Sequence, residues 1–213
     1  AGEYSIEAWV VPNNVAQENA WIVGYAGGPQ SRNTLLTQTM YNYDFYNRST
    51  ANNDGAGGPP TSTEDADEIA QASLQHVVLT YDPLTGRKIY VNGVDTNVID
   101  EAGPGNLTNW SDAFALVMGS DFAGSSSWAG VIRMVAIHSR SLTPAQILQN
   151  KEVGVGQKFY LMFSVADYVN DSGACRVNVN GEDTDYCYLV FQVSQFDNTS
   201  YLFTEPRFVN INP

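Results

Sequence analysis

Carboxylates are the side chains of this sequence best suited to chemistry, yet their spacing argues against catalysis. Glycoside hydrolysis needs two positioned carboxyl groups, one as the acid and one as the nucleophile or base. The densest acidic run, residues 64–68, lies in a polar segment preceded by glycine and proline that cannot form a core strand. Glu7 lies on a strand-like stretch, but no acidic residue follows it two or four positions later. We therefore expect residues 64–68 to be a solvated surface and the protein not to be an enzyme.

The two histidines give little support for nucleophilic or zinc chemistry. A Ser-His-Asp arrangement would need one of them as its base. His76 opens one strand-like run and His138 closes another, so we expect both to be strand-end residues that form hydrogen bonds. Two separated histidines without a Cys-x-x-Cys motif leave too few ligands for zinc.

Calcium is the metal that the acidic composition suits, because it takes oxygen ligands from carboxylates and backbone carbonyls. Asp44, Asp82 and Asp121 each fall near the end of a strand-like run, where loops could bring such oxygens together. A structural Ca²⁺ is therefore a possible cofactor, but the sequence leaves its ligands unassigned.

Five aromatic residues are the candidates for ligand binding. Protein sites for sugars often stack a ring on the pyranose face and hold the hydroxyls with amides and carboxylates. Polar Asn and Asp residues surround three of the candidates, and the other two lie in loops rich in Ser, Asn and Gly. The candidates are Tyr41, Tyr43, Tyr46, Trp110 and Trp128. The alternative is that these rings belong to the core or its rim.

The two cysteines, Cys175 and Cys187, indicate the compartment. A three-residue turn at Asn180-Gly181-Glu182 would place them directly opposite each other in a hairpin. A disulfide there would stabilise the fold by roughly 3 kcal/mol on the chain-entropy estimate. It would also imply an oxidising, secreted or cell-surface location. The alternative is a pair of buried thiols.

Composition bounds the class of partner. The formal charge of −13, from 23 acidic against 10 basic residues, disfavours nucleic acid, polyanions and anionic lipid. No stretch approaches the ~20 apolar residues of a membrane-spanning helix, so we expect no membrane insertion. Hydrophobic residues make up 43% of the chain, enough for a sizeable core.

Strand signals dominate the chain, and one short helix interrupts them. Asn92-Gly93 suits a type I′ hairpin turn, which would pair Val91 with Val94. Thr143 is the expected N-cap of the helix, with a capping-box Gln146 and an end near Val153 or Gly154. Apolar or β-branched runs of strand type lie at residues 4–10, 21–25, 34–46, 76–81, 87–91, 114–118, 131–137, 158–169, 186–196 and 201–211.

Three parts of the sequence, taken in order, resemble the concanavalin A-like lectin/glucanase superfamily and within it the laminin G-like and pentraxin-like domains. The first is Ser5-Ile6-Glu7-Ala8-Trp9-Val10. The second is a hairpin of residues 76–82 and 88–94, and the third is a closing signature in residues 118–121, 128–133 and 137–143. Arg133 and His138 depart from the family, which more often has Asp and Tyr at these positions.

The resemblance implies an all-β fold, a jelly-roll β-sandwich of two antiparallel sheets with about six or seven strands each. It would cover residues 1–156. Residues 157–213 either complete the sandwich or begin a second β unit, and the second reading is slightly favoured. The strand that precedes Ser5 in the family is missing here, so we expect the sequence to be a piece of a longer protein.

The resemblance leaves function open, because this scaffold hosts lectins, adhesins, hydrolases and spacers. We expect a non-catalytic extracellular binding or adhesion module, with a glycan as the first expected ligand and a partner protein as the second. The alternative is a spacer or assembly domain that packs against neighbouring domains or subunits. A glycoside hydrolase-related jelly roll is a distant third. Relatives often hold a structural Ca²⁺.

Overall fold

The computed structural model describes residues 2–52 and 58–155, without the side chain of Asp65, and beyond them only the backbone of six short strands. The chain packs as two compact units, unit 1 (Ala1–Val155) and unit 2 (Gly156–Pro213). None of the helices among the described residues combines the length with the apolar character that a membrane span requires.

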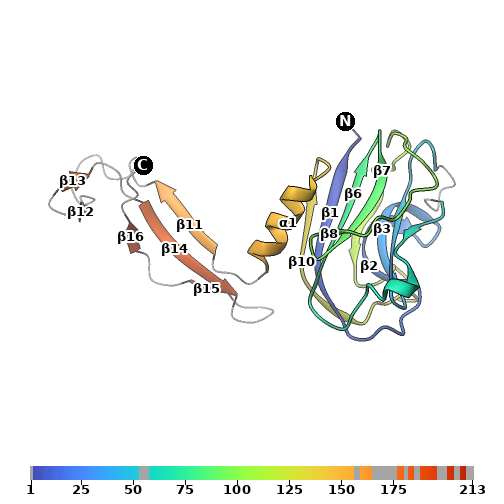
Figure 1. Cartoon of the computed structure of the whole chain (residues 1–213), viewed down its shortest axis with the longest axis horizontal. Helices are drawn as coiled ribbons and strands as arrows, with labels where there is room; N and C mark the ends of the chain where they lie inside the picture. Colours follow the sequence, from blue (N-terminus) through green and yellow to red (C-terminus); the bar gives the residue numbers. More distant parts are fainter. Residues whose placement is uncertain are drawn as a thin grey trace. The chain divides into compact units, whose positions relative to one another are not determined.

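Unit 1 is a sandwich of two antiparallel sheets (Figure 1). Sheet A has the strand order β10-β1-β6-β7-β8, and sheet B has the order β5-β4-β3-β2-β9. The strands of sheet A are β1 (Tyr4–Pro12), β6 (Gln75–Asp82), β7 (Gly86–Val91), β8 (Val94–Asp95) and β10 (Gly130–His138). Those of sheet B are β2 (Ala20–Gly28), β3 (Ser31–Thr39), β4 (Asn42–Asn47), β5 (Thr61–Ser62) and β9 (Ala115–Met118).

The expected all-β jelly-roll class is confirmed, with two differences in detail. Each sheet has five strands among the described residues, fewer than the six or seven implied by the resemblance. The apolar run at residues 34–46 is two strands rather than one. Met40 takes a positive φ of 52° in the turn between β3 and β4 and reverses the chain there.

Alternation along the strands places the core between the sheets. On β1, Tyr4, Ile6, Ala8 and Val10 belong to the main buried cluster, while the alternate residues Ser5, Glu7 and Trp9 point to the opposite face. The core side of sheet B is built in the same way from alternate residues of β3 and β4, including Leu36, Tyr43 and Phe45. Their burial between two layers is the main source of stability.

Helix α1 (Pro144–Val153) covers the outer face of sheet A, and η1 (Asp65–Asp67) is a single 3-10 turn. The capping box of Thr143 and Gln146 is present as expected. Leu142 and Ile147 pack on Val78 and Tyr90, so the helix seals an apolar patch on this face of sheet A. The hairpin at Asn92-Gly93 is also confirmed, since Val91 pairs with Val94.

Unit 2 contains strands from β11 (Phe159–Ser164) onward. The strand β14 (Tyr188–Gln195) pairs with β11, β15 (Tyr201–Phe203) and β16 (Arg207–Val209).

A separate hairpin joins β12 (Val177–Val179) to β13 (Glu182–Thr184). Its register pairs Val179 with Glu182, so Glu182 is a strand residue and the expected three-residue turn is wrong. Cys175 and Cys187 lie outside the described residues, and their disulfide stays a prediction.

Candidate functional site

The sandwich has two long sides, where the edges of sheets A and B meet. Segments beside β5 and β8 line one side, which carries a polar pocket. Residues of β9 and β10 line the other side, which carries an apolar cleft. The chemistry of the two sides differs completely.

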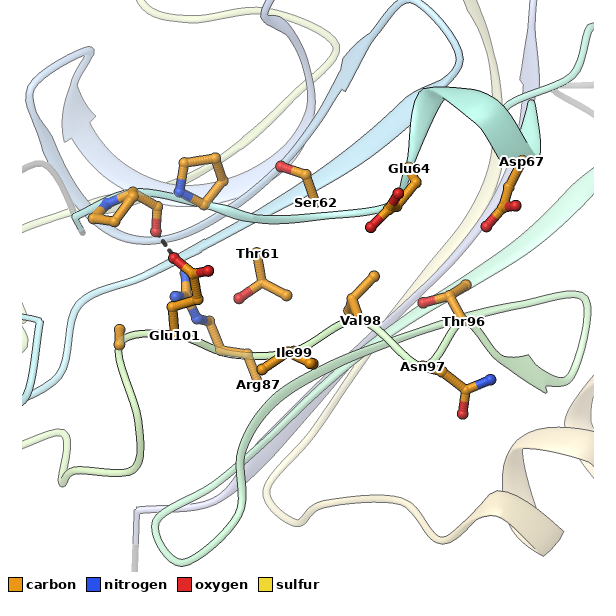
Figure 2. A pocket seen from close by; sticks show the side chains of 13 residues that line it. Thr61, Ser62, Glu64, Asp67, Arg87, Thr96, Asn97, Val98, Ile99 and Glu101 are labelled. Carbon is orange, nitrogen blue, oxygen red and sulfur yellow. Dashed lines mark hydrogen bonds between the residues drawn. The ribbon is translucent and has the colours of Figure 1, made fainter.

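The polar pocket has a volume of about 440 Å³. Figure 2 shows Glu64 and Asp67 on one wall, Thr96 and Asn97 across from them, and Glu101 near Arg87. Glu64, Asp67 and Glu101 are exposed. The pocket therefore offers hydroxyl, amide and carboxylate groups to a ligand from two opposed loops.

The base of the polar pocket is a buried ion pair. The guanidinium of Arg87 donates to Asp100 Oδ1 at 2.6 Å and to the carbonyl oxygens of Phe45 at 2.8 Å and Pro59 at 2.9 Å. The backbone N–H of Arg87 also donates to Asp100 Oδ2 at 2.8 Å. Burial alone would raise the pKa of Asp100, but the bonds from Arg87 outweigh it and hold that pKa below its ordinary value. This network fixes the loop at residues 96–102 against the sheet.

The apolar cleft on the other side has a volume of about 320 Å³. Trp110 packs edge-on against Tyr4, with ring centroids 5.0 Å apart, and Tyr25 lies 6.2 Å from Trp110. Leu116 and Ile137 also line the cleft, and their strands present them to the space between the sheets. They nevertheless stay 48% and 56% exposed, because no described element closes this side.

The structure separates the five predicted ligand-binding aromatics, and none of them lines the polar pocket. Tyr43 is completely buried, and its hydroxyl donates to Gln75 at 2.6 Å. Trp128 is 7% exposed, and its indole N–H donates to Gln38. Both side chains are part of the core, so ligand binding is no longer predicted for Tyr43 and Trp128.

The other three aromatics are half-buried. Tyr46 lies on the outer face of sheet B, opposite in direction to Tyr43, with the guanidinium of Arg32 4.1 Å from its ring centroid. Tyr41 lies in the turn before β4, and Trp110 walls the apolar cleft. Ligand binding by these three stays a prediction.

Both histidines converge on one buried carboxylate. Glu7 Oε1 lies 2.7 Å from His76 Nε2, and Glu7 Oε2 lies 3.0 Å from His138 Nε2. Asn150 of α1 donates to Glu7 Oε2 at 3.0 Å. Burial would raise the pKa of Glu7, but these hydrogen bonds hold it below the ordinary value. The expected hydrogen-bonding role of both histidines is confirmed, and the cluster ties α1 to sheet A.

The three candidate calcium ligands do not meet. Asp82 accepts from the backbone N–H of Leu84, and Asp121 accepts from Ser125, which holds the pKa of Asp121 below its ordinary value. Asp44 is buried and accepts from Thr37, Thr39 and Ser62. In the part of the chain that the structure describes, no group of three or more acidic, histidine or cysteine side chains could hold a metal. Calcium binding stays a prediction.

Sequence reasoning missed the residues that make the polar pocket. An Arg at the start of a strand, Arg87, was the available signal, because a charge facing the core must find a partner. Its partner Asp100 is 13 residues away in an irregular segment, and sequence alone does not show how that segment folds back.

The family follows from the match of the sequence to a family model. The model of the concanavalin A-like lectin/glucanases superfamily matches residues 1–148. The chain belongs to this superfamily. The match covers nearly all of unit 1, so the family resemblance is confirmed. No curated protein sequence matches the chain.

Solved structures of the superfamily's fold are similar to this chain at low identity. The CBM40 domain of the IT-sialidase of Ruminococcus gnavus, bound to α2,3-sialyllactose, is 16% identical with a TM-score of 0.53 over 70% of this chain and 82% of that one. A Bacteroides ovatus protein proposed to bind carbohydrate is 21% identical, with a TM-score of 0.52. The binding domain of botulinum neurotoxin DC, in complex with rat synaptotagmin II, is 13% identical, with a TM-score of 0.50.

The alignments cover 72% of this chain but only 42% of the Bacteroides ovatus protein, and 95% of this chain but 57% of the neurotoxin domain. These likenesses establish the fold.

Proposed function

We propose that unit 1 is a non-catalytic binding module of a larger extracellular surface protein, with an adhesion role and a glycan as its ligand. The polar pocket carries this proposal. Its volume of about 440 Å³ suits a sugar-sized ligand, and its opposed loops present groups that donate to and accept from hydroxyls. Among similar folds, one binds sialyllactose and another a protein receptor, so a protein partner is the second ligand class.

The exposure of the pocket carboxylates favours binding over hydrolysis. A glycosidase keeps its acid protonated by burying it in an apolar environment. Glu64, Asp67 and Glu101 are instead exposed to water on the rim. They are placed to accept hydrogen bonds from a ligand rather than to donate a proton to one.

A glycan array probed with and without calcium tests the proposal. Binding to at least one glycan is expected, and Asn97→Ala should weaken it about tenfold by removing hydrogen bonds to the ligand. Tyr46→Ala is the matched comparison, because it removes the half-buried aromatic on the outer face of sheet B and leaves the pocket intact. Loss of binding in Tyr46→Ala with Asn97→Ala unaffected would move the site to sheet B. Failure of every glycan to bind would refute a glycan ligand.

The apolar cleft favours a second candidate function, assembly with a neighbouring subunit or domain. Leu116 and Ile137 expose apolar surface that faces the interior of the sandwich, and a packed neighbour would cover it. Sedimentation of the whole chain tests this candidate. An assembly that Ile137→Asp dissociates would support it, and a monomer at every concentration would refute self-assembly.

A further inference from the structure

We infer that the polar pocket selects glycans by charge, taking amino sugars and neutral sugars and rejecting acidic ones. This inference rests on the proposed function and names the ligand class of the same site. It depends on which charges in the pocket are free to meet a ligand.

The positive charge of the pocket, on Arg87, is already paired with a carboxylate of the protein. Among the described residues that line it, Arg87 is the single basic side chain. Its guanidinium donates to Asp100 and to the carbonyl oxygens of Phe45 and Pro59, and its side chain is only 2% exposed. A carboxylate or sulfate on a sugar would therefore find no free guanidinium to pair with.

The negative charges of the pocket are free. Glu64, Asp67 and Glu101 are exposed, and they come from two segments that face each other across the opening (Figure 2). An adjoining depression shares Asp67 and Asn97 with the pocket and adds Glu68, so the negative field continues along this side. The formal charge of −13 for the whole chain has the same sign.

These charges set the expected order of affinity. An anionic sugar meets like charges and loses hydration without a partner, whereas an ammonium group gains attraction from the rim. At exposed positions one such contact changes affinity by about fivefold at low ionic strength. Salt screens the contact, so the discrimination should shrink at high ionic strength.

Two matched pairs of oligosaccharides isolate the effect of charge. A glucosamine tetramer carries ammonium groups where its N-acetylated form carries neutral acetamides, and a galacturonate tetramer carries carboxylates where its methyl ester carries neutral ester groups. Calorimetry on the whole chain should show the glucosamine tetramer binding about fivefold tighter than the N-acetylated one. The methyl ester should bind at least about fivefold tighter than free galacturonate.

A triple variant, Glu64→Gln with Asp67→Asn and Glu101→Gln, should erase both differences, so that the two members of each pair bind with equal affinity. Glu18→Gln is the control, because Glu18 is an exposed glutamate that does not line the pocket. Equal or tighter binding of free galacturonate, or discrimination that survives the triple variant, overturns the inference while the glycan function stands. Failure of all four sugars to bind overturns the inference, whereas the glycan function is refuted only if every glycan on the array also fails to bind.

Discussion

The gap between the two sheets is closed in different ways at the two long sides of the sandwich. Beside β5 and β8, the loop at residues 96–102 closes the gap between the sheets, and a buried Arg87–Asp100 ion pair fixes it. Beside β9 and β10, rings such as Trp110 narrow the gap, yet Ile137 stays 56% exposed although its strand presents it to the interior.

This difference shows that the way in which a side of the sandwich is closed determines whether the surface there is polar or apolar. A loop held by hydrogen bonds brings its own polar groups, so its outer side becomes a rigid polar pocket suited to selective binding. An edge covered only by aromatic contact keeps a surface that water wets poorly. The β5/β8 side is therefore suited to a soluble ligand, and the β9/β10 side to a neighbouring subunit or domain packed against it.

Breaking the ion pair should give the largest effect on the β5/β8 side. Arg87→Met leaves Asp100 buried without its partner, so the free energy of unfolding should fall by about 3 to 5 kcal/mol. Urea unfolding followed by tryptophan fluorescence measures this in unit 1, because all four tryptophans lie within residues 1–155. Lys88→Met is the control, since the side chains of the Lys88–Asp95 pair are 44% and 29% exposed and the pair should contribute less than about 1 kcal/mol. Equal losses in the two variants would refute the structural role of Arg87.

One substitution at two positions compares the core with the open side directly. Ile89 on β7 is completely buried, so Ile89→Ala should lower the free energy of unfolding by about 2 to 5 kcal/mol. Ile137 on β10 is 56% exposed, so Ile137→Ala should lower it by less than about 1 kcal/mol. Urea midpoints of the two variants provide the test. A large loss from Ile137→Ala would mean that the β9/β10 side is covered in solution.

Acid should destabilise unit 1 through Asp100 and Glu7, whose pKa values both lie below the ordinary ones. The unfolded state, with ordinary pKa values near 4, takes up protons first as the pH falls. The stability from these carboxylates is therefore present above about pH 4 and lost as the pH drops through the lower, folded pKa values. The loss should be on the order of 1 to 3 kcal/mol for each carboxylate.

Unfolding curves between neutral and acidic pH measure this loss. Asp100→Asn and Glu7→Gln should each flatten the pH dependence. Ile137→Ala should leave it parallel to that of the unchanged protein, because the apolar cleft holds no titrating carboxylate among its lining residues. An unchanged slope in Asp100→Asn would contradict the acid sensitivity assigned to the β5/β8 side.

Local chemistry made much of the fold predictable from sequence. The alternation of Tyr4, Ile6 and Ala8 fixes which face of β1 is buried, and Asn92-Gly93 fixes a hairpin register because few residues accept its positive φ values. The capping residues of α1 work in the same way, since they depend on neighbours three positions apart. Each of these features is decided within a few residues.

The candidate site could not be predicted in this way, because its parts meet only through the tertiary fold. Glu7 has no acidic partner two or four residues along its strand, and the side chains that do contact it, His76 and His138, reach it from other strands. Strand alternation predicts opposite directions for Tyr43 and Tyr46, but only the layering of the sheets shows that Tyr43 is the one in the core. Composition gave the sign of the surface charge, but not where the free carboxylates gather.

The smallest expected effect on stability tests the proposed use of the apolar cleft. Ile137→Ser with Leu116→Ser should change the free energy of unfolding by less than about 1 kcal/mol per site, because the two side chains are 56% and 48% exposed. The pair should still reduce the binding of a hydrophobic dye and any self-association seen by sedimentation, since both depend on exposed apolar area. Leu84→Ser is the control, because Leu84 is 84% exposed and lies outside the cleft. If dye binding fell equally in the control, the apolar surface that binds the dye would lie outside the cleft. The proposed contrast between a polar β5/β8 side and an apolar β9/β10 side would then be wrong.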